Sequence, residues 1–83
     1  MKAQAQTKDE WREWINKNPL KVWKEKYNVY TLNELASRLG TSILTVNAWL
    51  LGMQMPRDER MARVTKITGV TQTELRTWYN SRP

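Results

Sequence analysis

The chain has 83 residues, the size of one small domain, and a net charge of +6 that favours attraction to polyanions such as nucleic acids. It contains no Cys and no His, which excludes disulfides, thiol chemistry and the commonest general base and metal ligand. It has no signal-peptide pattern and no apolar run approaching the roughly 20 residues of a membrane-spanning helix. We therefore expect a soluble, cytoplasmic protein with no membrane partner.

The N-terminal segment is expected to be a disordered tail over residues 1–6, followed by a short helix over 8–17. Thr7 and Glu10 have the spacing of a capping box that begins this helix. Its apolar side chains recur at helical spacing and form one stripe: Trp11, Trp14 and Ile15. Two interpretations stay open, because the stripe either packs on the other helices or presents its tryptophans to a dimer partner or another protein.

A second helix is expected to begin at Pro19, since proline suits the first helical position and the preceding Asn18 ends the first helix. Its apolar residues fall on one face: Leu20, Trp23 and Tyr27. The link over residues 28–30 then leads to the central segment.

The central segment, from Thr31 to Gly52, is predicted to be two short helices joined by a tight turn, a helix-turn-helix. Thr31 and Glu34 have the spacing of a second capping box. Gly40 ends the first helix in the left-handed conformation, Ser42 caps the second helix, and Gly52 ends it. The residues expected to face inward are Leu32, Leu35, Ala36 and Leu39 in the first helix, and Val46, Trp49 and Leu50 in the second.

Two further helices are expected after the loop that contains Pro56. One extends from Arg57 to Thr68 and ends at Gly69, and the last begins at a third capping box formed by Thr71 and Glu74. Their inward residues are predicted to be Met61, Val64 and Thr65, then Leu75 and Trp78. The fold class is therefore all-α, a compact bundle of five to six helices, with a single domain over residues 7–80 and a frayed end over 81–83.

The spacing within the central segment is specific. Ala36 lies four residues before Gly40, Val46 lies six after it, and Trp49 lies three after Val46. This pattern resembles the helix-turn-helix of the lambda-repressor/Cro (Xre-like) family of phage and bacterial DNA-binding regulators. The resemblance extends upstream through NPLKVWKEKY and downstream through WLLGMQMP and MARVTKITGV. It implies a lambda-repressor-like fold and a repressor- or Cro-like transcriptional regulator that binds double-stranded DNA as a homodimer.

In such a motif the second helix lies in the major groove. The resemblance places the DNA base-contacting positions at Ile43, Leu44, Asn47 and Ala48. It places the DNA backbone-contacting positions at Lys24, Asn33, Thr41, Ser42 and Arg57. Asn47 is expected to make a bidentate contact to adenine, and the apolar residues are expected to touch thymine methyl groups.

The sequence also departs from this family. Leu32 stands where the family usually has Gln, and no charged residue occurs from Leu39 to Met55. An alternative therefore stays open: a protein-interaction module, antitoxin-like or a phage protein that captures a host factor, which docks through the apolar face of the same helix. A third possibility is an architectural DNA protein of phage excision or packaging. The residues of a possible dimer or partner surface are Trp11, Trp14, Leu51, Met53, Met55 and Trp78.

The sequence holds no recognisable catalytic arrangement. Its carboxylates are scattered, and it lacks a glycine-rich phosphate loop, a nucleophile with a base, and a metal-ligand cluster. We therefore expect no enzymatic activity, no cofactor, no metal and no small-molecule ligand.

Overall fold

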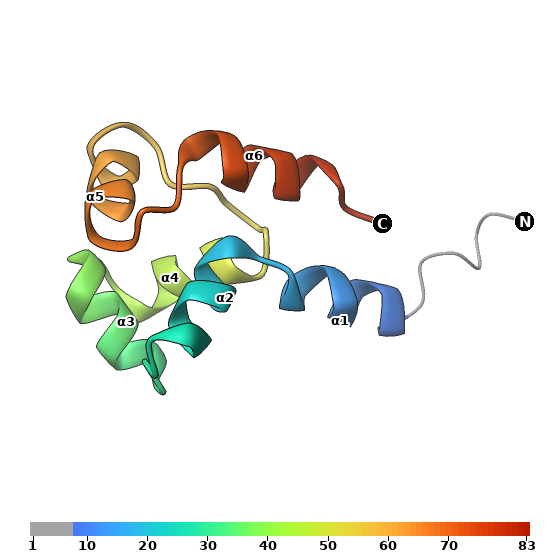
Figure 1. Cartoon of the computed structure of the whole chain (residues 1–83), viewed down its shortest axis with the longest axis horizontal. Coiled ribbons are helices and arrows are strands. Elements are labelled where there is room, and N and C mark those ends of the chain that lie inside the picture. The colour runs from blue at the N-terminus through green and yellow to red at the C-terminus, as the bar shows by residue number, and fades with distance from the viewer. Residues whose placement is uncertain (1–7) are drawn as a thin grey trace, which may run out of the picture.

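The computed structural model describes residues 8–83, and this part of the chain consists of helices without any strand. The helices are α1 (Lys8–Asn16), α2 (Pro19–Lys26), α3 (Leu32–Leu39), α4 (Ile43–Leu50), α5 (Asp58–Thr68) and α6 (Gln72–Asn80). The molecule is compact, with a Cα radius of gyration of 13.1 Å, and α1 extends from one end of it (Figure 1). Within the described range, the helices are too short or too polar to cross a membrane. The predicted tail and the Thr7 cap lie outside the described residues.

Most helix ends are formed by the residues that the sequence analysis named. Ser42 Oγ accepts a hydrogen bond from the Thr45 amide at 3.1 Å, and Thr71 with Glu74 forms a complete capping box. The predicted capping box at Thr31 is only half formed. Thr31 Oγ1 accepts from the Glu34 amide, but the Glu34 carboxylate pairs with Arg38 at 2.9 Å. The Glu34 carboxylate therefore has Arg38, one helical turn further along α3, as its partner in place of the Thr31 amide.

The hydrophobic core is shared by five helices and two of the connecting segments. It contains Leu20, Val29, Leu35, Ala36, Leu39, Val46, Trp49, Leu50, Met61, Val64, Val70 and Leu75. Tyr27, the C-cap of α2, lies beside Trp23 with ring centroids 5.3 Å apart, and it is exposed. Asn28 then adopts a positive φ of 59°, and Val29 is buried in the core. Thr65 is half-buried, and its hydroxyl donates to the Val70 carbonyl at 2.8 Å.

Asn18 does more than interrupt the helical pattern. Its side chain is fully buried, and its Oδ1 accepts hydrogen bonds from the amides of Leu20 at 2.7 Å and Lys21 at 3.4 Å. Its Nδ2 donates to the carbonyls of Trp49 at 3.1 Å and Leu50 at 3.3 Å. One amide thus caps the N-terminus of α2 and satisfies carbonyls at the C-terminus of α4.

Trp14 of α1 and Trp78 of α6 stack on each other, with ring centroids 4.0 Å apart and ring planes at 6°. Each indole Nε1 donates to the backbone carbonyl of the other residue, at 2.8 Å and 2.6 Å. The two side chains are only 5% and 7% exposed. The expectation that these two tryptophans form a partner surface is therefore corrected, because each is buried against the other. For Trp14, the structure supports the first interpretation of α1, in which the helix packs on the rest of the molecule.

Candidate nucleic-acid interface

Helices α3 and α4 pack against each other and are joined by a tight turn at Gly40 (Figure 1). Gly40 has a φ of 69°, its amide donates to the Ser37 carbonyl at 3.2 Å, and the Thr41 amide donates to the Ala36 carbonyl at 3.0 Å. These two bonds form a Schellman motif, which needs a residue that takes positive φ at low cost. The turn therefore fixes the direction in which α4 leaves α3.

Helix α4 has one buried face and one outward face. Val46, Trp49 and Leu50 are buried, as the sequence predicts. The predicted base-contacting residues lie on the other side: Leu44 is 82% exposed, Ile43 is 41% exposed, and Asn47 and Ala48 are half-buried. The Asn47 side chain makes no hydrogen bond within the described residues. The structure thus leaves the N-terminal half of α4 available for contact with another molecule.

The predicted backbone-contacting residues are distributed unevenly around α4. Thr41 and Ser42 lie in the turn immediately before it, and Arg57 precedes α5. Asn33 is exposed near the N-terminus of α3, whereas the α3–α4 connection at Gly40 follows the C-terminus of that helix. Lys24 is half-buried on α2.

Three arginines of α5 and its N-cap form a feature that the sequence analysis only partly identified. Arg57, Arg60 and Arg63 follow one another at intervals of three residues and are all exposed, and we call them the arginine row. Three-residue spacing places Arg60 and Arg63 on one side of α5, whereas Arg57 precedes the helix with an extended backbone. None of the three forms an ion pair within the described residues.

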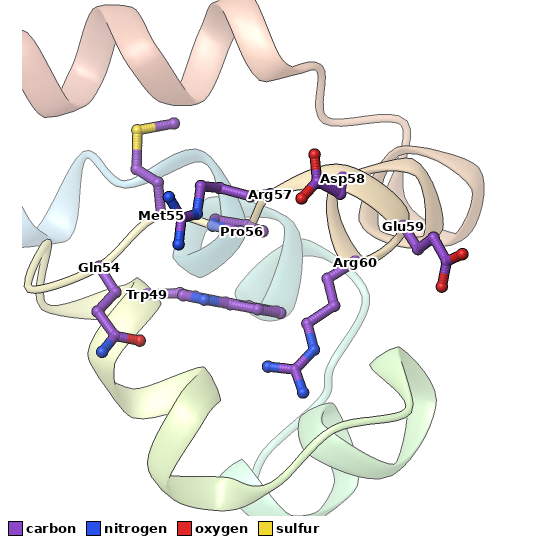
Figure 2. A pocket seen from close by; sticks show the side chains of 8 residues that line it. All are labelled: Trp49, Gln54, Met55, Pro56, Arg57, Asp58, Glu59 and Arg60. Carbon is purple, nitrogen blue, oxygen red and sulfur yellow. The ribbon is translucent and has the colours of Figure 1, made fainter.

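The arginine row lies beside both ends of α4. Arg57 and Arg60 line a surface hollow of about 520 Å³ together with Trp49, which is near the end of α4. Arg63 lies against the turn before α4, since a Cβ added to Gly40 would be 2.7 Å from its Nε. Figure 2 shows Arg60 extending toward α3 and α4, whereas the carboxylates of Asp58 and Glu59 in the same hollow point in other directions.

Sequence reasoning named Arg57 but missed Arg60 and Arg63. The three-residue spacing is visible in the sequence, and within the helix it indicates a common side of α5 for Arg60 and Arg63. It does not indicate which neighbour that side faces. The packing of α5 on α3, which the structure shows, supplies this information.

The chain matches no family model, no curated protein and no solved structure.

The remaining residues of the predicted partner surface differ in exposure. Leu51 and Met53 are exposed, whereas Trp11 and Met55 are half-buried. Met55 packs against the core, and the Trp11 ring meets the Trp14 ring edge-on at 5.5 Å. Four exposed apolar residues lie on α4 or directly after it, and we call them the α4 apolar face: Ile43, Leu44, Leu51 and Met53.

Proposed function

We propose that this protein is a sequence-specific double-stranded DNA-binding protein of the lambda-repressor/Cro type, which inserts α4 into the major groove. The observation that carries the proposal is the exposed N-terminal half of α4, flanked by an arginine row without ion-pair partners among the described residues. In helix-turn-helix proteins the N-terminal residues of the second helix face the base edges, and the first helix crosses the backbone. The Schellman turn between α3 and α4 is compatible with this arrangement.

The proposal divides the contacts into two groups. The arginine row, with Thr41 and the free amides at the Ser42 end of α4, would bind phosphates and position the protein. Ile43, Leu44, Asn47 and Ala48 would face base edges, where the amide of Asn47 can bond both N6 and N7 of adenine. The net charge of +6 supports the phosphate contacts, although it does not by itself select a sequence.

We further propose that the protein binds as a homodimer on a two-fold symmetric site, in the manner of a phage or bacterial repressor. One helix of eight residues contacts only a few base pairs, so a second copy supplies affinity and sets the spacing of half-sites. Because Trp14 and Trp78 are buried, their rings are not available for this contact. Trp11 is the tryptophan of α1 that retains accessible surface.

The proposal is tested by selection from a pool of random duplex oligonucleotides at two salt concentrations, with sequencing of the retained fraction. We expect an enriched palindrome whose half-sites lie about one helical turn apart, and retention that falls steeply with salt. Weak retention without sequence enrichment, lost at the higher salt, would contradict the proposal. Tight retention without a preferred sequence would favour an architectural DNA protein instead.

A second candidate function is supported by the α4 apolar face, because exposed apolar patches on small proteins often mark protein contacts. In this candidate, α4 docks on a protein partner and phosphates are not involved. Replacing Leu44 with Asp would then abolish partner binding, and the binding of the unchanged protein would depend little on salt. Steep salt dependence of the wild-type complex would argue against it.

A further inference from the structure

The outward face of α4 offers apolar surface and very few hydrogen-bonding groups. Its most exposed side chain is Leu44, and Ile43 lies beside it in the sequence. Ser42 Oγ accepts from the Thr45 amide at 3.1 Å and donates to Thr45 Oγ1 at 2.9 Å, so this hydroxyl is engaged within the helix cap. On the exposed part of α4, Asn47 alone carries a side-chain amide.

Three arginines without ion-pair partners among the described residues lie around this apolar face, and the carboxylates of Asp58 and Glu59, which line the same hollow as two of them, point in other directions. Arg57 and Arg60 line the hollow at one end of α4, and Arg63 lies at the turn before the other end. No carboxylate occurs between Leu39 and Met55. An apolar helix between such arginines is complementary to a polyanion that presents apolar groups in a groove, whereas a uniformly apolar protein surface would leave these arginines without partners.

Duplex DNA presents one apolar group in its major groove, the C5-methyl group of thymine. Guanine and unmodified cytosine are recognised there through hydrogen bonds, typically to Arg, Lys, Asp or Glu, and α4 carries none of these residues. The methyl group of 5-methylcytosine occupies the same ring position as that of thymine. A helix that selects thymine by its methyl group therefore also favours methylated over unmethylated cytosine.

We propose that α4 recognises C5-methylated pyrimidines, thymine and 5-methylcytosine, through Ile43 and Leu44 as its principal base contact. This inference rests on the proposed function, because it requires α4 to enter the major groove. It goes beyond the expected thymine contacts in making the C5-methyl group the principal determinant of base recognition and in predicting sensitivity to cytosine methylation.

The test uses four alternating duplex polymers, which carry the same phosphate charge: poly(dA-dT), poly(dA-dU), poly(dG-dC) and poly(dG-5-methyl-dC). Affinities are measured by fluorescence anisotropy in a buffer without divalent cations, with the B-form of each polymer checked by circular dichroism. Each pair differs only in the C5-methyl group, so the phosphate contribution cancels within a pair. We expect the methylated member of both pairs to bind more tightly, by about fourfold for each methyl group that is buried.

Variants connect this preference to α4. Ile43→Ala and Leu44→Ala change exposed side chains, and we expect both to reduce the methyl preference while the protein stays folded. Ile67→Ala is the matched control, since Ile67 on α5 is 40% exposed and Ile43 is 41% exposed. This control should retain the full preference.

Equal affinities within both pairs would overturn the inference. If the random-pool selection still yields a palindrome, DNA reading stands and only the methyl contact is refuted. If no sequence is selected and the four polymers bind alike, both proposals fail and the α4 apolar face is left as a protein-docking surface. A methyl preference that survives in Leu44→Ala and Ile43→Ala would place the reading group elsewhere and would likewise refute the inference.

Discussion

Asn18 illustrates how a single side chain connects two helices in this small protein. Its amide bonds backbone groups at the start of α2 and at the end of α4, two segments that are about 30 residues apart in the chain. It is fully buried, so water cannot replace these partners. The position of the C-terminal end of α4 therefore depends on this residue.

We predict that Asn18→Ala lowers the free energy of unfolding by about 2–4 kcal/mol, because a helix cap is removed and the Trp49 and Leu50 carbonyls each lose a buried hydrogen bond. Asn18→Asp should cost at least as much, since the carboxylate keeps the cap acceptor but faces the α4 carbonyls without a donor. Urea denaturation followed by tryptophan fluorescence measures both changes. Asn16→Ala, at an exposed residue nearby, serves as the control and should change stability by less than about 0.5 kcal/mol. Near wild-type stability of Asn18→Asp would show that the bonds to α4 contribute little.

At the scale of helices, the arginine row and α4 form the element pair on which DNA binding is proposed to depend. Arg63 of α5 lies against the α3–α4 turn at Gly40, whereas Arg57 and Arg60 lie beside Trp49 near the other end of α4. Interactions of this kind affect affinity for all sequences alike, because phosphates are the same in every duplex.

We predict that Arg60→Ala and Arg63→Ala each reduce the slope of log affinity against log salt by about 1, because each variant neutralises one phosphate fewer than the wild-type protein. The decrease in affinity should be similar for selected and unrelated duplexes. Arg76→Ala removes the same charge from an exposed position on α6 and is the control. An equal effect of all three substitutions would indicate that net charge, and not the arginine row, determines the salt dependence.

The sequence predicted the helices well, because their limits depend on local chemistry. Gly40, Ser42, Thr71 and Gly69 act within a few residues of their own positions, and the structure shows each of them at the helix end where it was expected. The inward face of α4 also follows from residue spacing alone.

Contacts between distant segments were not predictable in this way. Trp14 and Trp78 lie 64 residues apart, and periodicity indicates only that each is on an apolar face, without identifying its partner. The same limit applies to Asn18, whose partners include carbonyls at the end of α4, and to Arg63, which lies against the turn at Gly40. The burial of Val29 was not predictable either, because it lies in the link between α2 and α3, where the chain turns at Asn28 and helical spacing does not apply.

At the scale of the whole molecule, the stacked rings of Trp14 and Trp78 join α1 to α6, the first and last helices of the described residues. Gly52 lies against them with a φ of 74°, and a Cβ at this position would collide with the Trp14 ring. The loop after α4, the first helix and the last helix therefore meet at one point, where no larger residue than glycine fits.

We predict that Gly52→Ala lowers the free energy of unfolding by roughly 2–5 kcal/mol, because strain at positive φ adds to the clash with Trp14. Gly69→Ala separates the two causes, since Gly69 has a φ of 81° and no atom lies within 4 Å of the added Cβ. Gly69→Ala should lower the free energy of unfolding by only about 1–2 kcal/mol. Chemical denaturation gives both values, and equal decreases would show that the packing of Trp14 on Gly52 is unimportant.

The most direct measurement of the central claim, that α4 and the arginine row bind duplex DNA, is a two-dimensional amide NMR titration of the ¹⁵N-labelled protein with the duplex enriched by selection. We predict that the largest shift changes occur at Thr41 to Ala48 and at Arg57 to Arg63, while the indole N–H signals of Trp14 and Trp78 move little. Shift changes confined to α1 and α6, or none in α4 at saturating duplex, would contradict the claim.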